Sequence, residues 1–134
     1  MKKIAIIGAG ISGLYLANLL EKEKNFEYKI FEKRPKLNLE KGYGIQLSVN
    51  CIKLLNKIGF KNIPVLDIFF PSKVNFFKSN NPNKICDIDL TQFNDDLNRY
   101  TTTKRSTLLK FLLENIPKDK IKFNTILKHL DYSN

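Results

Sequence analysis

The sequence is poor in the residues that build metal sites, disulfide frameworks and nucleophilic catalytic sets. Its 134 residues include two cysteines, one methionine, one histidine and no tryptophan. Cys51 and Cys86 share no CxxC or metal-ligand spacing, and His129 has no identifiable partner, so we expect no metal site and no Ser/His/Asp or Cys/His catalytic set. Both cysteines are expected to be reduced packing residues, with Cys51 on one helical stripe beside Leu54 and Leu55.

Long apolar runs and acidic residues are also scarce. The apolar segment after Lys2 and Lys3 stops at Gly8, which is too short for a membrane span and has no signal-peptide cleavage pattern. A cytoplasmic protein is therefore expected. The 23 basic residues outnumber the 13 acidic ones, which gives a net charge of +10. Because the lysines are scattered and form no basic stripe with exposed aromatics, we expect no nucleic-acid binding, and peripheral contact with an acidic membrane stays open.

Glycine is used sparingly, and three glycines stand together near the start of the chain. The apolar run of residues 4–7 predicts a parallel strand covered on both faces, and Gly8, Gly10 and Gly13 follow it at GxGxxG spacing. Gly8 permits a tight turn, Gly10 lets the backbone approach a pyrophosphate, and Gly13 allows close packing of the next helix on the sheet. The pattern predicts a dinucleotide site, with an ordinary structural βαβ turn as the alternative.

The segment after this turn supplies two further parts of a dinucleotide site. A helix over residues 11–24 would present the free N–H groups of its first turn, including those of Ile11 and Ser12, to an anion at its positive end. A short second strand, Tyr28 to Phe31, ends at Glu32, nineteen positions beyond Gly13. A carboxylate at that place can accept hydrogen bonds from both ribose hydroxyls and would repel the 2′-phosphate of NADP.

The middle of the chain predicts a strand, a helix and a hairpin. Residues 45–47 read as a brief strand, and a helix with apolar positions 51, 54, 55 and 58 ends at Gly59. Between residues 73 and 90 apolar and polar side chains alternate around a turn, which predicts a β-hairpin. Asp87 and Asp89 on it have the spacing of paired catalytic carboxylates, but on an alternating strand they most simply form the solvated face.

The last third of the chain predicts a capped helix and a final strand. The run from Thr101 to Thr103 offers caps for a leucine-rich helix that Pro117 stops, and a strand from Ile121 runs on towards Leu130. Arg105 lies in the first turn of this helix, where the dipole disfavours a cation unless an anion compensates. A cofactor could be that anion, and so could a nearby acid such as Asp95 or Asp96.

Three separated stretches resemble one enzyme family. IAIIGAGISGLYLANLL with IFEKRP, then GYGIQLSVNCIKLLNKIGF, then TKRSTLLKFLLENI are together similar to the FAD-dependent aromatic-ring monooxygenases of the para-hydroxybenzoate hydroxylase superfamily, which includes ubiquinone-biosynthesis hydroxylases. The first stretch alone also suits amine oxidases and other flavoproteins. The second and third stretches narrow the resemblance by their order and spacing.

The resemblance implies a cofactor, a reaction and roles for individual residues. FAD would be reduced by NAD(P)H and would react with O₂ to hydroxylate a small, aromatic substrate, so no protein nucleophile or metal is needed and the catalytic residues stay unknown. The cofactor-binding residues that it implies are, for the pyrophosphate, Gly8, Gly10, Ile11, Ser12 and Gly13; for the adenosine half, Glu32, Arg34 and, more weakly, Lys33; and for the flavin side, Gly44, Ile45 and Arg105.

The resemblance also implies an α/β fold, a Rossmann-like βαβ FAD-binding domain that is incomplete. Residues 1–134 match only the N-terminal third of the family pattern: a βαβ core with the following strand and helix (1–68), a β-hairpin excursion (69–99), and a returning helix and strand (100–134). The later Asp-Gly and Gly-Asp segments of the family do not appear. Remaining enzyme segments or a partner chain are therefore expected to be required. The alternatives are an amine-oxidase-type flavoenzyme and a non-catalytic nucleotide-binding fragment.

Overall fold

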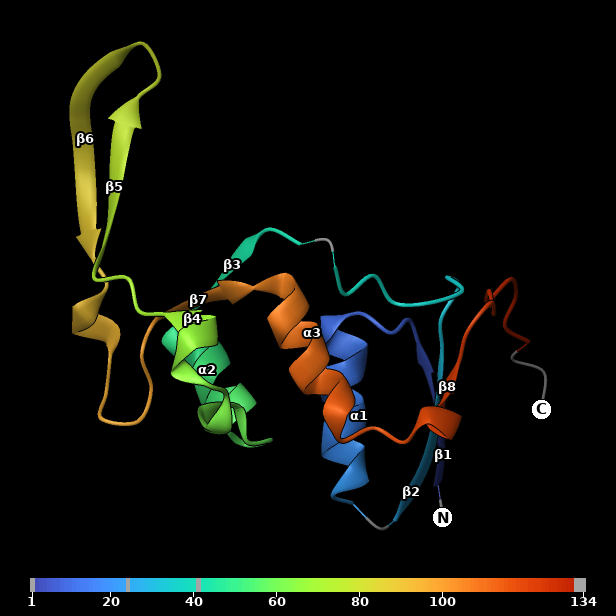
Figure 1. The fold of residues 1–134 in the computed structure, drawn as a ribbon. Coiled ribbons are helices and arrows are strands. Elements are labelled where there is room, and N and C mark those ends of the chain that lie inside the picture. The colour runs from blue at the N-terminus through green and yellow to red at the C-terminus, as the bar shows by residue number, and fades with distance from the viewer. Residues whose placement is uncertain (1, 24, 41, 132–134) are drawn as a thin grey trace. The chain divides into compact units, whose positions relative to one another are not determined.

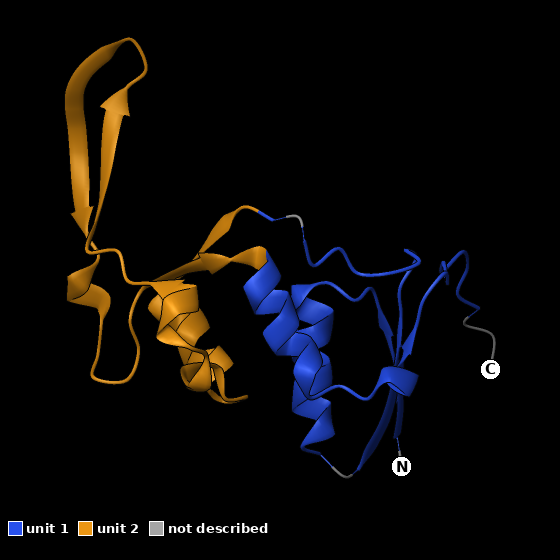
Figure 2. Cartoon of the chain, viewed as in Figure 1, with its two compact units in different colours: residues 1–42, 106–134 blue, residues 43–105 orange. Residues whose placement is uncertain are grey.

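The structure is a computed structural model, and it describes residues 2–23, 25–40 and 42–131. The chain forms two compact units, which Figure 2 shows in different colours. Unit 1 comprises residues 1–42 and 106–134, and unit 2 comprises residues 43–105.

Unit 1 contains a three-stranded parallel sheet with the order β1-β2-β8 (Figure 1). Its strands are β1 (Lys2–Ile7), β2 (Phe26–Phe31) and β8 (Ile121–Lys122), and its helix α1 (Ile11–Glu21) connects β1 to β2. A parallel pair needs such a crossover because the chain must return to the same end of the sheet. The predicted α/β fold with a parallel sheet and a βαβ core is confirmed.

One face of this sheet carries the core of unit 1. Ile6 on β1 pairs in register with Ile30 on β2, and both side chains are buried. Helix α3 (Arg105–Glu114) begins at the last residue of unit 2 and otherwise belongs to unit 1. The apolar stripes of the two helices complete the core with Leu14, Ala17, Leu108, Leu109 and Leu112, all at most 1% exposed.

The prediction that β1 is covered on both faces is wrong for the described residues. Ala5 and Ile7 alternate with buried Ile6, and both are exposed, Ile7 to 54%. β1 lies at the edge of the sheet, with β2 as its hydrogen-bonded neighbour. The apolar run therefore has one buried and one open face.

Unit 2 is built on a three-stranded antiparallel sheet with the order β3-β7-β4. Its strands are β3 (Gly44–Leu47), β4 (Ile68–Phe69) and β7 (Thr101–Lys104), with α2 (Val49–Asn56) after β3. The predicted strand at 45–47 is confirmed. The threonines 101–103 were predicted as helix caps, but they form the central strand, because β-branched residues suit a strand paired on both sides.

The other predictions for unit 2 are partly confirmed. The hairpin is present as β5 (Lys73–Lys78) and β6 (Asn81–Asp89) (Figure 1). The packing role predicted for the two cysteines is wrong, since Cys51 and Cys86 are both exposed. Helix α2 instead buries Val49, Ile52 and Leu55, which recur every three residues and form its buried face. Position 51 lies off this face and is therefore exposed.

Several predicted element ends also differ from the structure. Helix α1 ends at Glu21, before the predicted end at residue 24. Helix α2 ends at Asn56, and Gly59 follows three residues later in a left-handed conformation with φ of 97°. The final strand has only two residues, Ile121 and Lys122, and residues 124–130 contain neither helix nor strand. Asn124, with φ of 53°, takes the chain out of the extended region directly after this strand.

Candidate nucleotide-binding site

The glycine turn between β1 and α1 leaves the start of the helix open to an anion. Gly8 has φ of 100°, a value that side-chain-bearing residues rarely adopt, and its N–H donates to Phe31 O at 2.8 Å. Gly10 is the N-cap of α1 and has no side chain to bond the first-turn N–H groups. No acidic side chain lies in that turn. The N–H groups and the positive helix end are therefore available to a phosphate.

Gly10 and Gly13 are small for different reasons. A Cβ on Gly13 would lie 2.1 Å from Gly8 O and 3.2 Å from Ile6 Cγ2, so the packing of α1 on β1 excludes any side chain there. A Cβ on Gly10 would meet no atom within 4 Å. The fold therefore has room for a side chain at Gly10, and the open space beside it is where a ligand could approach the backbone.

Glu32 lies directly after β2 and is tied to the same turn. Its side chain is buried, with 7% exposure, and both carboxylate oxygens are occupied by backbone donors. Ala9 N–H donates to Oε2 at 2.8 Å, and Arg34 N–H donates to Oε1 at 3.0 Å. Because each carboxylate oxygen can accept about two hydrogen bonds, both oxygens keep capacity for a ribose hydroxyl.

The surroundings of Glu32 hold its side chain in the charged form. Burial acts to raise the pKa of Glu32, but the backbone hydrogen bonds from Arg34 and Ala9 and the charges of Arg34 and Lys33 together outweigh it. The pKa of Glu32 is therefore below its ordinary value. At neutral pH the site presents a buried carboxylate that accepts hydrogen bonds and repels further negative charge.

The chain after Glu32 is held by the segment that follows β8. Glu32 N–H donates to Lys122 O at 2.9 Å, and Thr125 N–H donates to Glu32 O at 3.0 Å. Arg34 O accepts a hydrogen bond from Asn124 N–H at 3.2 Å. The exposed side chains of Lys33 and Arg34 therefore extend from a backbone that is fixed on both sides of the carboxylate.

Gly44, Ile45 and Arg105, which are predicted to lie on the flavin side, belong to unit 2. In the β3–β7 pair Gly44 is opposite Lys104 and Ile45 is opposite Thr103. Arg105 N–H donates to Tyr43 O at 3.1 Å, which continues this pairing into the first residue of α3. The structure thus places these three predicted residues at one end of β3 and β7.

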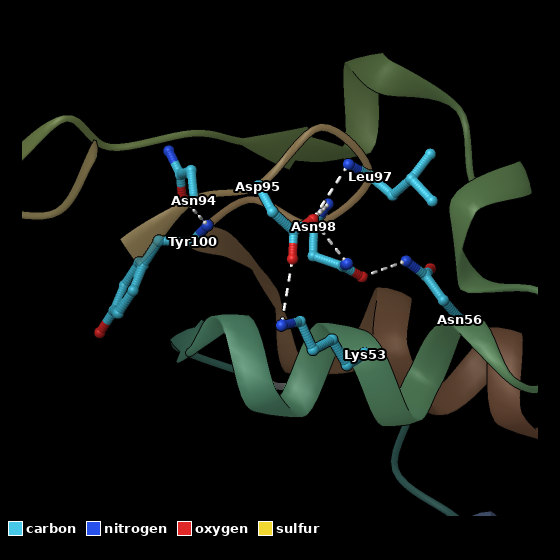
Figure 3. Close-up of polar contacts among 7 residues, drawn as sticks. All are labelled: Lys53, Asn56, Asn94, Asp95, Leu97, Asn98 and Tyr100. Atoms are coloured by element: carbon cyan, nitrogen blue, oxygen red, sulfur yellow. Dashed lines mark hydrogen bonds and ion pairs between the residues drawn. The ribbon is translucent and has the colours of Figure 1, made fainter. Parts of the chain in front are cut away.

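The acid offered as an alternative partner for Arg105 is engaged elsewhere. Asp95 forms an ion pair with Lys53 on α2 at 3.1 Å, and its Oδ1 accepts from Leu97 N–H and from the backbone and side chain of Asn98 (Figure 3). The Asn98 side chain and Lys53 lower the pKa of Asp95 to about 2. Within the described ranges, the Arg105 guanidinium has no ion pair with Asp95 or Asp96.

The carboxylates of the hairpin are occupied by lysines and by a turn. Asp87 pairs with Lys84 at 2.6 Å and with Lys73 at 3.3 Å, and Asp89 accepts hydrogen bonds from the Thr91 N–H and hydroxyl. Both aspartates are exposed. These contacts agree with a solvated, structural face and give no geometry for paired acid and base catalysis. In the part of the chain that the structure describes, no three His, Cys, Asp or Glu side chains gather as metal ligands.

Two residues of unit 1 were missed in the sequence. Ala9 bonds Glu32 through its backbone, and a backbone donor leaves no residue-type signal. Asn18 is 4% exposed, and its Nδ2 donates to Leu14 O at 2.9 Å and to Leu112 O at 2.7 Å. A polar residue on the otherwise apolar stripe of α1 was the available signal for this contact between α1 and α3.

The family of NAD(P)-binding Rossmann-like domains matches residues 6–39, which include the glycine turn and Glu32. Monooxygenase asqM of Emericella nidulans is 30% identical over 128 residues, covering 92% of this chain and 28% of its own. The 3-amino-4-hydroxybenzoate 2-monooxygenase of Streptomyces cremeus is 38% identical over 60 residues, covering 45% of this chain and 15% of its own.

Solved structures share the fold at lower identity. The 2,6-dihydroxypyridine-3-hydroxylase of Arthrobacter nicotinovorans matches with a TM-score of 0.73 and 17% identity, over 98% of this chain and 31% of its own. HpxO of Klebsiella pneumoniae, solved with FAD and uric acid, matches with a TM-score of 0.71 and 19% identity. The match covers 92% of this chain and 31% of HpxO. The chain thus spans less than a third of these proteins. The predicted resemblance to FAD-dependent monooxygenases is confirmed, and the chain is similar to one part of such enzymes.

Proposed function

We propose that this chain forms the adenosine-binding part of an FAD-dependent monooxygenase that hydroxylates a small aromatic substrate with NAD(P)H and O₂. The observation that carries the proposal is the hydrogen bond from Ala9 N–H to Glu32, because it joins an uncapped helix N-terminus to a buried, ionised carboxylate. Together these groups supply one subsite for a pyrophosphate and one for a ribose.

The residues of unit 1 fit the ADP half of FAD. The open space at Gly10 admits a phosphate close to the backbone, and the N–H groups of Ile11, Ser12 and Gly13 lie in the first turn behind it. Glu32 would accept the ribose hydroxyls, and Arg34, with the weaker candidate Lys33, would lie beside the adenosine. When bound, FAD supplies the electron transfer and the oxygen chemistry, while these side chains hold and orient it.

Residues of unit 2 would serve the flavin side of the cofactor. Arg105 would contact the ribityl and phosphate region, since its charge at a helix start favours a nearby anion. Gly44 and Ile45, which pair with the residues just before Arg105, would run near the flavin ring. Resemblance to the family motifs supports these three roles. The role of Arg105 is also supported by the absence of an ion pair between Arg105 and Asp95 in the described ranges.

Flavin binding by single-residue variants tests the assignment. Glu32→Ala and Arg105→Ala should each weaken FAD binding, which is measured by the change in flavin fluorescence on titration with protein. Asp87→Ala is the matched control, because Asp87 is also a carboxylate but pairs with two lysines on the hairpin. Equal FAD affinity in all three variants and the unchanged chain would refute the proposed roles of Glu32 and Arg105.

Two other functions remain as alternatives. A different FAD-dependent oxidoreductase, such as one of amine oxidase type, would share the glycine turn and Glu32 but not the monooxygenase motifs. The coding sequence beyond the codon for Asn134 distinguishes the two, since the monooxygenase proposal requires Asp-Gly and Gly-Asp segments there. A non-catalytic nucleotide-binding fragment would be favoured by purified protein with neither flavin absorbance nor NADPH oxidation.

The proposed partners are a small-molecule substrate and the remaining segments of the enzyme, in the same chain or a partner chain. Among the described residues no helix has the length and apolar character to cross a bilayer. A cytoplasmic location and peripheral contact with an acidic membrane are further proposals, and the net charge of +10 supports the second. Co-sedimentation with phosphatidylserine vesicles, compared with phosphatidylcholine vesicles, tests this contact.

A further inference from the structure

The parallel ladder between β2 and β8 changes its pattern directly after β8. Glu32 N–H donates to Lys122 O at 2.9 Å, as a regular parallel ladder requires. Such a ladder would continue with Asn124, whose N–H would donate to Glu32 O and whose carbonyl would accept from Arg34 N–H. Instead, Thr125 N–H donates to Glu32 O at 3.0 Å. Asn124 N–H donates to Arg34 O at 3.2 Å.

This pattern inserts one residue into the ladder, as a β-bulge does. Thr125 takes the place at Glu32 O that Asn124 would have in a regular ladder, so Asn124 is the inserted residue. The same change releases Arg34 N–H from the ladder. This N–H donates to Glu32 Oε1 at 3.0 Å. The insertion of Asn124 therefore makes available one of the two backbone donors that hold the Glu32 carboxylate.

The backbone conformation of Asn124 is what permits the insertion. Its φ is 53°, and among the described residues other than glycine it alone has a positive φ. Asparagine adopts this left-handed region more readily than most residues that carry a side chain, and β-branched residues adopt it least. The Asn124 side chain is exposed, so its packing does not explain why the position needs this residue type.

We propose that Asn124 is a positioning residue for the ribose subsite. Its left-handed conformation holds the Arg34 backbone where Arg34 N–H fixes Glu32, and Glu32 then accepts the ribose hydroxyls and rejects a 2′-phosphate. Asn124 acts through Arg34 and Glu32, so it sets the specificity of the site through the backbone. The proposal rests on the proposed function, because that function assigns the ribose to Glu32.

The pKa of Glu32, measured without nucleotide by NMR titration of its carboxyl carbon, tests this positioning directly. In the unchanged chain and in Asn124→Gly this pKa should lie below its ordinary value, since glycine also adopts the left-handed region. In Asn124→Val it should rise, because Arg34 N–H no longer stabilises the charged form. Asn124→Ala disfavours the same conformation more mildly and replaces Asn124→Val if that variant does not fold.

A matched control separates positioning from general backbone strain. Gly59 in unit 2 also has a left-handed conformation, with φ of 97°. Gly59→Val should therefore destabilise the chain in a similar way but leave the pKa of Glu32 unchanged.

Nucleotide binding, measured by isothermal titration calorimetry, tests the consequence for specificity. Asn124→Val should bind ADP about tenfold more weakly than the unchanged chain, as expected when a charged hydrogen-bond acceptor is misplaced. Its preference for ADP over 2′-phospho-ADP should fall at least about threefold, whereas Asn124→Gly should keep both affinities within about twofold. Partial unfolding cannot mimic this result, because it lowers both affinities by the same factor.

Two results would overturn the proposal. One is a Glu32 pKa in folded Asn124→Val, or in Asn124→Ala, that equals the pKa in Asn124→Gly. The other is a rise of the Glu32 pKa in Gly59→Val as large as that in Asn124→Val. A chain that binds neither nucleotide would contradict the proposed function instead, and the pKa of Glu32 would still decide whether Asn124 positions this carboxylate.

Discussion

Gly10 and Gly13 show how two residues of one motif can be required for different reasons. The Cβ of Gly13→Ala would lie far inside contact distance of Gly8 O, so this variant should lose about 1 to 3 kcal/mol of stability or more. Gly10→Ala should lose less than about 1 kcal/mol, because its Cβ meets no atom. Its FAD affinity should nevertheless fall, since the methyl group occupies the proposed phosphate position. Thermal unfolding by circular dichroism and flavin fluorescence titration measure the two effects.

The two variants are each other's controls in this experiment. If the Gly10→Ala variant melts as the unchanged chain does and binds FAD with unchanged affinity, then no ligand approaches the backbone at Gly10. The alternative of a purely structural βαβ turn would then hold.

Glu32 should make the stability of the fold depend on pH. Its folded-state pKa is lowered, so its stabilising contribution is present above the unfolded-state pKa, roughly 4.3, and is lost as pH falls through the folded-state value. Glu32→Gln should therefore cost about 1 to 3 kcal/mol at pH 7, because a charged acceptor of two backbone N–H groups becomes neutral. The cost should shrink towards pH 3, because the side chains at this position become neutral in both proteins as pH falls through the folded-state pKa of Glu32.

Urea unfolding followed by circular dichroism at pH 7 and at pH 3 measures this difference. Asp87→Asn is the control, since Asp87 also has a lowered pKa but is exposed on the hairpin. A destabilisation by Glu32→Gln that is the same at both pH values would mean that the charge of Glu32 does not strengthen its bonds to Ala9 and Arg34.

Among the elements, α3 depends on a side chain from another helix to complete its C-terminal end. Leu112 O is one of the last four carbonyls of α3, and the N–H four residues later, that of Ile116, bonds Leu113 O instead. Asn18 on α1 donates to Leu112 O and so satisfies this buried acceptor. The hydrogen bond therefore fixes the end of one helix against the middle of the other.

Removal of this contact should weaken unit 1. Asn18→Ala leaves Leu112 O without its partner and should lower the free energy of unfolding by about 1 to 3 kcal/mol. Asn115→Ala, which changes an exposed asparagine just after the same helix, should have a much smaller effect. Equal melting temperatures for the two variants would show that the Asn18 contact does not contribute to stability.

Some elements could be predicted because a local sequence signal determines their type or their ends. The glycine turn fixes where β1 ends and α1 begins, and strict alternation predicts the hairpin. The threonines 101–103 were misassigned because hydroxyl side chains suit both a helix cap and a strand, and only the pairing of β7 with β3 and β4 selects the strand. The burial of Cys51 was misjudged because two apolar stripes, 51-54-55-58 and 49-52-55, share Leu55, and α2 buries the second.

At the scale of the whole molecule, the part of the site that is local in sequence was the part that could be predicted. Gly8 to Glu32 lie within one βαβ unit, so spacing alone brings them together. The contribution of Ala9 could not be predicted, because it is a backbone hydrogen bond across 23 positions. Gly44 and Ile45 were predicted through resemblance alone, and Arg105 through resemblance and its place at a helix start. All three belong to a different compact unit from the glycine turn.

This division between the units leads to a prediction about which half of the cofactor the chain recognises. Unit 1 holds the proposed pyrophosphate and ribose subsites, so most of the binding free energy available to residues 1–134 should come from the ADP half. ADP and FAD should then bind with Kd values within about tenfold of each other, a difference of at most about 1.4 kcal/mol. Isothermal titration calorimetry measures both, and NADP should bind more weakly than NAD because Glu32 repels its 2′-phosphate. Binding of FAD more than about a hundredfold tighter than ADP would instead show that unit 2 already binds the flavin ring.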